Sequence, residues 1–308
     1  MRFHGCWLEA GTLLLRSQVY LPVFRQKWKS STARTNEDRI CHHLSPIKDR
    51  PLRVLRREDL QRLLDAKARA GLSFSIITHL RWDLKQIFDL AVDEGLVKRN
   101  PAVLLFTPRH ARRIDKRQLT WIEVESLFIN LALRERLIVS LALVVGMRPG
   151  EIFALQWRHF KGGSISVEQR VYRGKIDTPK TVRSAREFAL SRGVQSLMEQ
   201  WLQFAPATKT GDWTFPSENL KTPLSRDNFL QRMIKPKLKL VGLEWVNFQV
   251  LRRPHANLMR ELDVDPKLVA DQLGHTLDVN LNVYTSTSPE ARRAALETFE
   301  SNLNVAVQ

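Results

Sequence analysis

The sequence predicts a mainly α-helical protein with a small antiparallel β-sheet. The chain has 308 residues, enough for two domains of ordinary size. Apolar residues recur with a helical period from Tyr20 to about Arg109 and again after Thr120, whereas they alternate with a period of two between residues 164 and 190. We therefore expect four segments: a short N-terminal extension (1–19), a helical domain (20–106), a basic linker (107–117) and a mixed α+β domain with a C-terminal helix (118–308).

Two strong helices are expected in the helical domain. The first covers Arg57–Ala70 and ends at Gly71, a residue type that is common at helix C-termini. The second carries an amphipathic apolar stripe over residues 76–91, with Ser75 as the expected N-cap and Gly95 as the terminator.

The second domain is expected to begin with a capped helix and a buried one. Thr120 and Glu123 have the spacing of a capping box, which predicts a helix start near Trp121. Residues 137–145 are apolar almost all round, as expected of a helix at the centre of a domain. The glycine- and proline-containing segment 146–151 interrupts this helix, and apolar residues resume over 152–157.

The remainder of the second domain combines a sheet with further helices. Alternation over 164–190 predicts a short antiparallel sheet, and a helix is expected over Arg192–Gln203. Asp265 and Ser288 each precede a proline, a pair typical of a helix N-terminus.

The chain is strongly basic. Lysine and arginine number 49 against 32 aspartates and glutamates, which gives a formal net charge of +17. Basic residues are in excess on both sides of residue 115. This distribution suits a protein that contacts a polyanion along its whole length, and a solvated basic surface is the alternative interpretation.

The composition also excludes several classes of protein. With 43% hydrophobic and 26% charged residues the chain is globular. No stretch approaches the roughly 20 apolar residues of a membrane span. Cys6 and Cys41 are too few for a disulfide framework or a zinc site, so the composition favours a cytoplasmic protein.

The expected linker contains several basic residues, among them Arg112 and Arg113, and has no apolar period. It is interpreted as an exposed basic loop or as a strap along phosphate groups, and these two interpretations are compatible.

Arg148 is the first charged residue that interrupts a strongly apolar stretch. It stands between Gly146 and Pro149 at the junction of buried segments, and Glu151 follows three residues later. A guanidinium near a domain core needs a partner. Either Arg148 and Glu151 form a structural pair, or Glu151 braces Arg148 while its guanidinium binds a phosphate.

Two further stretches place functional side chains in apolar surroundings. The first contains Gln249, Arg252 and Arg253, and the second contains His275 with Tyr284 nine residues later. Taken singly, a tyrosine of this kind is usually a packed residue, and a single histidine is usually inert.

In order and spacing these pieces resemble the tyrosine recombinase (phage integrase) family over most of residues 20–300. The quoted segments are 146–151 (GMRPGE), 178–181 (TPKT) before 186–188 (REF), 251–252 (LR), and 273–275 (LGH) with Tyr284. Residues 49–52 through 100–102 resemble the helical core-binding (SAM-like) domain of the same family. The resemblance implies a site-specific recombinase, of the mobile-element type, that breaks and rejoins DNA strands through a covalent 3′-phosphotyrosine.

The resemblance also implies a role for each residue of the site. Tyr284 matches the nucleophile, whose phenol needs nearby positive charge or a proton acceptor to react at neutral pH. Arg148 and Arg252 match the two arginines on the scissile phosphate, and His275 matches a donor to the same phosphate. Lys180 matches the lysine that protonates the leaving 5′-oxygen.

Other residues would support these five. Glu151 matches the acidic residue that braces the first arginine, and Lys175, Arg183 and Arg253 are expected to contact the DNA backbone.

The implied partners are double-stranded DNA and further copies of the chain, in a homotetramer on paired sites. No ATP is expected, because the phosphotyrosine keeps the energy of the broken bond. No metal or small-molecule cofactor is expected either, since the sequence has no P-loop pattern and no cluster of carboxylates or histidines with ligand spacing, and no membrane partner is expected. Tetramers of this family exchange a C-terminal segment, and residues 288–308 would do so here unless they pack on their own domain.

Three departures from the family pattern affect these expectations. Gln249 stands where most members have a histidine, and Pro254 stands where a small hydroxylated residue is usual. Gln249 can donate a hydrogen bond but cannot exchange protons near neutral pH, and Pro254 can kink a helix. His255 is a weak candidate to replace the missing histidine. The short extension leaves no room for the arm-type domain of larger integrases, so the chain is either a short recombinase or one that has lost its start.

These departures leave two alternatives to an active recombinase. One is a degenerate integrase that binds DNA without cutting it. The other is a relaxing enzyme of the type IB topoisomerase kind, which would use the same chemistry without a specific site.

Overall fold

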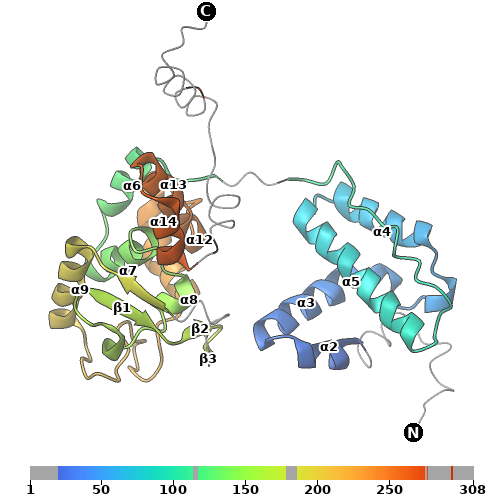
Figure 1. The fold of residues 1–308 in the computed structure, drawn as a ribbon, viewed down its shortest axis with the longest axis horizontal. Helices are drawn as coiled ribbons and strands as arrows, with labels where there is room; N and C mark the ends of the chain where they lie inside the picture. Colours follow the sequence, from blue (N-terminus) through green and yellow to red (C-terminus); the bar gives the residue numbers. More distant parts are fainter. Residues whose placement is uncertain (1–19, 114–116, 178–185, 275, 277–292, 294–308) are drawn as a thin grey trace, which may run out of the picture. The chain divides into compact units, whose positions relative to one another are not determined.

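The computed structural model describes residues 20–113, 117–177, 186–274, 276 and 293, and the chain forms two compact units, Met1–Lys116 and Arg117–Gln308 (Figure 1). The regular elements in the described part of unit 1 are helices, and those in the described part of unit 2 are helices and two short β-ladders. The expected fold class, mainly α with small antiparallel sheets, is confirmed. The expected extension over 1–19 and the helix start at Ser288 lie outside the described residues.

The described part of unit 1 contains four α-helices around one apolar core. They are α2 (Leu21–Lys27), α3 (Ser30–His43), α4 (Arg57–Arg69) and α5 (Phe74–Asp93), with 3₁₀ turns at Ser45–Ile47 and Leu52–Val54. Fully buried side chains from α3, α4 and α5 form the core, including Ile40, Leu60, Leu64, Leu84 and Phe88. The apolar stripes that predicted α4 and α5 are therefore the faces that these helices bury.

The N-cap of α5 is Ser73 and not the expected Ser75. The Ser73 backbone is extended, and its hydroxyl accepts a hydrogen bond from the Ile76 amide. The helix thus starts two residues earlier than expected, and the Phe74 amide at its first position donates to the Arg112 carbonyl at 2.9 Å.

The first part of the expected linker belongs to unit 1. Ala111 is 3% exposed and packs in the core of this unit, while the Arg112 carbonyl holds the start of α5. The side chains of Arg112 and Arg113 are exposed, and the Arg113 guanidinium lies 4.8 Å from the centre of the Phe74 ring. These two cations are thus presented on a segment that packing holds in place.

A buried ion pair joins α3 to α5. Arg39 donates to both carboxylate oxygens of Asp83, at 2.7 and 2.8 Å, and the Asp83 side chain is 7% exposed. Burial raises the pKa of the Asp83 carboxyl, and Arg39 opposes this effect. The pair is needed because an ionised carboxylate cannot be buried without a partner.

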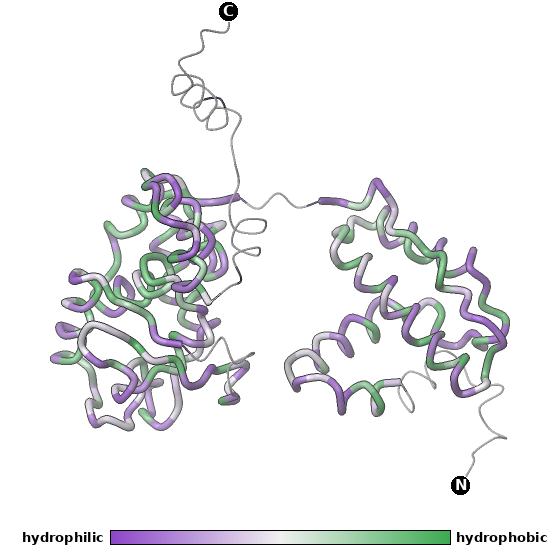
Figure 2. Tube along the Cα trace, in the orientation of Figure 1, coloured by the Kyte–Doolittle hydropathy of each residue, from purple (hydrophilic) through white to green (hydrophobic). Residues whose placement is uncertain are grey.

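Unit 2 is built around the apolar helix α7 (Leu133–Leu143), which packs against α9 (Arg192–Phe204) and α12 (Phe248–Arg252). Figure 2 shows the hydrophobic character of the central part of this unit. The capping box of Thr120 and Glu123 is present at the start of α6 (Trp121–Phe128), as predicted. No helix among the described residues is both long and apolar enough to cross a membrane.

The apolar helix ends earlier than expected. Helix α7 stops at Leu143, and α8 (Pro149–Ile152) is a single turn that does not continue through 152–157. The amides of Ala154 and Leu155 make local turn bonds, and those of Trp157 and Arg158 donate to carbonyls of residues 212 and 210 in a distant loop. A 3₁₀ turn, Trp157–His159, follows.

The antiparallel strands expected over 164–190 are present, and among the described residues they form two separate ladders where one sheet was expected. Strand β1 (Ser164–Val167) pairs with β4 (Arg186–Ala189), and β2 (Arg170–Tyr172) pairs with β3 (Lys175–Asp177), both antiparallel. Ile165 lies opposite Phe188, and both are fully buried, so the first ladder belongs to the core. The second ladder packs on α8, where the approach is so close that a Cβ on Gly150 would lie 2.8 Å from the Val171 carbonyl oxygen.

The C-terminal part of unit 2 is helical. Its elements are α10 (Arg226–Phe229), a π-helical segment (Leu230–Ile234), α11 (Lys235–Lys239), α12, α13 (Pro254–Glu261) and α14 (Pro266–Leu273). Asp265 caps α14 through the Lys267 amide, as predicted.

A buried histidine joins α13 to the end of α7. His255 is 4% exposed, and its Nδ1 lies 3.1 Å from the Leu143 carbonyl oxygen. Burial is the main cause that lowers the pKa of His255, the nearby Arg252 lowers it further, and the backbone contacts to Leu143 and Val144 oppose the change. His255 is therefore neutral in the folded protein near pH 7 and donates through Nδ1 to this carbonyl.

Replacing Asp83 by alanine should destabilise unit 1 by about 3 kcal/mol, because Arg39 would remain largely buried without its carboxylate. Urea unfolding of the full chain would measure the loss. Arg62→Gln is the matched control, since it removes an ion pair with Glu58 whose side chains are 74% and 69% exposed and should cost less than about 1 kcal/mol. Equal, small losses in both variants would contradict the role given to the Arg39–Asp83 pair.

His255 should make unit 2 less stable in acid. Its pKa is lowered in the folded state, so below the ordinary histidine value of 6.5 the unfolded chain takes up a proton that the folded chain does not. The free energy of unfolding should therefore fall with pH from about 6.5 downward, by at most about 1.4 kcal/mol per pH unit from this residue.

The measurement compares urea unfolding at about pH 7.5 and 5.5 for the parent chain and for His255→Asn, whose amide can still donate to Leu143. The variant should lose about 1 kcal/mol less on acidification than the parent does. His110→Asn, which removes an exposed histidine, serves as control, and a parent-like slope in His255→Asn would refute the assignment.

Candidate functional site

Arg148 lies on the turn between α7 and α8 and is the N-cap residue of α8, with Pro149 at the first helical position. The turn is packed directly against α14. Gly146 has φ of +76°, and a Cβ at this position would lie 2.5 Å from Leu273 Cδ2. Only glycine meets both demands, which explains why the apolar helix is interrupted here.

The Glu151 carboxylate holds Arg148 in two ways. One oxygen accepts from the Arg148 guanidinium and the other from the Arg148 backbone amide, both at 2.9 Å. The Glu151 side chain is 4% exposed, whereas that of Arg148 is 38% exposed. The arginine is thus fixed from its buried side and open to solvent on the other.

Arg186, on β4, approaches the same carboxylate. Its two terminal nitrogens lie 3.4 and 3.3 Å from the two oxygens of Glu151, and its side chain is 9% exposed. Burial lowers the pKa of the Arg186 guanidinium, Glu151 opposes this, and Arg148 adds to it. Glu151 therefore serves two cations at once.

Arg252 is the last residue of α12 and is buried, at 5% exposure. It donates to the Leu273 carbonyl at 2.8 Å, which ties α12 to the end of α14. Gln249, one turn earlier, is exposed, and Asn247 caps the helix through the amides of residues 249 and 250.

Pro254 interrupts the helix immediately after Arg252. Helix α12 ends at Arg252, and Pro254 is the first residue of α13. The backbone stays helical at Arg253, whose amide still donates to the Gln249 carbonyl at 3.2 Å. The proline thus divides the helix without displacing Arg252 from its last turn. His255 is packed against α7 while Gln249 is exposed, so His255 does not occupy the position of the missing histidine.

The remaining predicted residues fall in three places. Lys175 is exposed on β3, and Arg253 is half-buried between α12 and α13. Arg112 and Arg113 belong to unit 1. Lys180, Arg183, His275 and Tyr284 lie outside the described residues. Within the described part of the chain, no three metal-ligating side chains form a group that could hold a metal ion.

Arg186 is the residue of this cluster to which the sequence analysis gave no role. A signal was present, because side chains two apart on a strand share a face and Phe188 is fully buried. Arg186 is therefore an arginine on the inward face of a strand, where it needs a carboxylate partner.

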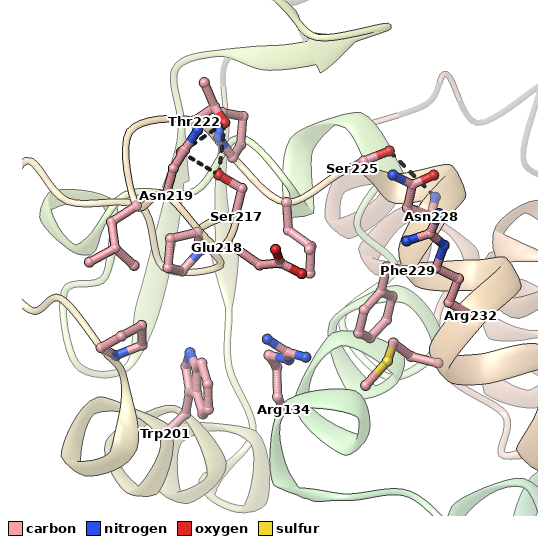
Figure 3. Close-up of a pocket in the computed structure, with 16 residues that line it drawn as sticks. Arg134, Trp201, Ser217, Glu218, Asn219, Thr222, Ser225, Asn228, Phe229 and Arg232 are labelled. Carbon is pink, nitrogen blue, oxygen red and sulfur yellow. Dashed lines mark hydrogen bonds between the residues drawn. The ribbon is translucent and has the colours of Figure 1, made fainter.

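A pocket of about 810 Å³ in unit 2 is separate from this cluster (Figure 3). Its wall includes Arg134 at the start of α7, Trp201 on α9, the loop 216–225 and Arg232. Arg148, Glu151, Arg186, Gln249 and Arg252 are not among the residues that line it.

Comparison with known sequences places the chain in a family. The profile of the phage integrase family matches residues 112–291. The ICEBs1 integrase of Bacillus subtilis is 26% identical over 247 residues, which are 71% of this chain and 65% of that protein. A XerC-like tyrosine recombinase of Caldanaerobacter subterraneus is 26% identical over 281 residues, 80% of this chain and 71% of its own length. The chain thus spans about two thirds of the length of these two relatives.

Solved structures share the fold. The Tn1549 transposon integrase in complex with a circular intermediate DNA has a TM-score of 0.78 at 17% identity, over 94% of this chain and 99% of the other. A lambda integrase dimer bound to a COC′ core site has a TM-score of 0.64 at 19% identity, over 83% and 89%. With its family profile covering more than half of the sequence, the chain belongs to the phage integrase family of tyrosine recombinases.

Proposed function

We propose that the protein is a site-specific DNA recombinase of a mobile element, which cleaves and rejoins strands through a 3′-phosphotyrosine at Tyr284. The observation that carries the proposal is that two arginine side chains contact the same segment, residues 273–274 at the end of α14. Arg252 is bonded to the Leu273 carbonyl, and Arg186, which shares Glu151 with Arg148, packs against Gly274. The next residue in the chain is His275.

This arrangement suits a phosphodiester as substrate. Attack by a phenolate gathers negative charge on the non-bridging phosphate oxygens, and fixed guanidinium groups stabilise that charge without reorganising. Arg148 is held by a buried carboxylate and is open on its other side, as a phosphate ligand should be. Arg252 and His275 would complete the phosphate contacts.

The remaining roles follow from the chemistry of strand exchange. The Tyr284 oxygen forms a bond to phosphorus while the 5′-oxygen leaves and takes a proton from Lys180. Attack by the 5′-hydroxyl of a partner strand reverses the step and releases Tyr284. The reaction conserves the number of phosphodiester bonds, so it needs no ATP.

Duplex DNA is the proposed partner of both units, with Arg112, Arg113, Lys175, Arg183 and Arg253 as backbone contacts. The exposed positions of Arg112, Arg113 and Lys175 support this assignment. A homotetramer on paired DNA sites is the proposed assembly.

Tyr284→Phe should abolish covalent capture of DNA and leave DNA affinity within about twofold, because the substitution removes only the attacking oxygen. The substrates are nicked duplexes tiled across the sequence that flanks the coding region, and adducts are detected on denaturing gels. A parent protein that binds a duplex but forms no adduct, or a phenylalanine variant that still forms one, would refute the proposal.

A second candidate function is DNA binding without cleavage, which the exposed Gln249 and the helix break at Pro254 favour. If the chain is degenerate in this way, Gln249→His combined with Pro254→Thr should create adduct formation that the parent lacks.

If the parent is active, the same double variant should change its rate by less than about tenfold, since Arg252 already occupies the last turn of α12. Relaxation of a supercoiled plasmid that lacks any captured site separates both outcomes from a topoisomerase-like enzyme.

A further inference from the structure

We propose that Arg186 is a positioning residue for strand cleavage: it locks the buried Glu151 carboxylate behind Arg148 and sets the position of the Leu273–Gly274 segment that leads into His275. This inference rests on the proposed recombinase function. It gives a role to a residue that does not itself reach the phosphate.

The contact with Glu151 is the first step of the argument. Both terminal nitrogens of Arg186 reach the carboxylate, at 3.4 and 3.3 Å, while Arg148 holds it with a side-chain and a backbone bond. A carboxylate bound on several sides cannot rotate away from Arg148. Arg186 therefore limits the freedom of the guanidinium that is open to solvent.

The contact with Gly274 is the second step. Gly274 ends α14 in a left-handed conformation, with φ of +63°. A Cβ built on this glycine would lie 2.7 Å from Arg186 Cζ and Nε, so the guanidinium occupies the space that any other residue would fill. The side chain also lies 4.2 Å from the centre of the Phe188 ring, which fixes it on the face of β4.

The same segment is held from a second direction. Arg252 donates to the Leu273 carbonyl, and Gln272 donates to the Ala189 carbonyl at the end of β4. Arg186 thus connects the two arginines expected on the phosphate, Arg148 through Glu151 and Arg252 through residues 273–274.

The contacts of Arg186 favour positioning over direct contact with the phosphate, because both of its terminal nitrogens are directed to the Glu151 carboxylate. The side chain of Arg186 is 9% exposed, whereas that of Arg148 is 38% exposed. A phosphate that approaches from solvent meets Arg148, and Arg186 lies behind it.

The test measures the rate of covalent adduct formation and the DNA dissociation constant of the full chain on the captured duplex. Arg186→Gln should slow adduct formation by about 10- to 100-fold and change the dissociation constant by less than about threefold. Arg186→Lys should recover part of the rate, because an ammonium keeps the charge near Glu151 but not the two-pronged contact. Arg226→Gln, which removes an exposed arginine paired with Asp227, should behave like the parent.

A double-mutant cycle with Glu151→Gln separates positioning from loss of stability. If Arg186 acts through Glu151, the Arg186→Gln and Glu151→Gln effects on rate should be far from multiplicative at a temperature where all four proteins are folded. Multiplicative effects, or an unchanged rate in Arg186→Gln, would overturn the inference while leaving the recombinase proposal intact. A parent protein that forms no adduct would overturn both.

Discussion

The buried carboxylate of Glu151 is the constraint on which the rest of the site depends. A carboxylate at 4% exposure is tolerated only with cationic partners, and here it has two, Arg148 and Arg186, that come from α8 and β4. Removing either arginine leaves the carboxylate held by the other alone, and free to turn away from it. The carboxylate therefore joins three parts of unit 2 that the sequence separates: the turn after α7, the β1–β4 ladder and, through Arg186, the end of α14.

Glycines make this convergence possible. At residues 146 and 274 a side chain would collide with Leu273 or with Arg186, and both residues also have positive φ. At residue 150 a side chain would collide with the backbone of β2. Each glycine allows a backbone segment to approach a neighbour more closely than a Cβ permits, so the cluster is compact because of residues that contribute no functional group.

Local signals in the sequence predicted most of the fold. Capping residues and apolar periods gave α4 and α9 nearly to the residue and the starts of α6 and α14, because these features are determined by local caps and faces. Predictions were wrong where tertiary contacts override local preference. Ser73 rather than Ser75 caps α5, next to the Phe74 amide that the distant Arg112 carbonyl accepts from, and the apolar segment 152–157 leads into a 3₁₀ turn whose Trp157 and Arg158 amides are bonded to residues 212 and 210.

The same contrast between local and long-range contacts determines which parts of the site could be predicted. Arg148 with Glu151 could be predicted because the partners lie three residues apart in an apolar setting, within reach of a helix turn. Arg186 could not be paired from sequence, since its carboxylate is 35 residues away and its contact with Gly274 spans a further 88. Lys180, His275 and Tyr284 lie outside the described residues, so their roles stay predictions from the family resemblance.

The net charge of +17 is therefore not a uniform supply of cations for DNA. Arg39 and Arg186 are paired with buried carboxylates, so their positive charges support the fold and the site geometry, and Arg252, which is buried and bonded to the Leu273 carbonyl, is assigned to the single scissile phosphate in the proposed function. Arg112, Arg113 and Lys175 are exposed and available to phosphates. Because only cations that displace counterions from DNA contribute to the salt dependence of binding, that dependence should report the exposed set and not the total charge. In the proposed function, Arg186 and Arg252 act on the reaction geometry, and salt screens such buried contacts much less.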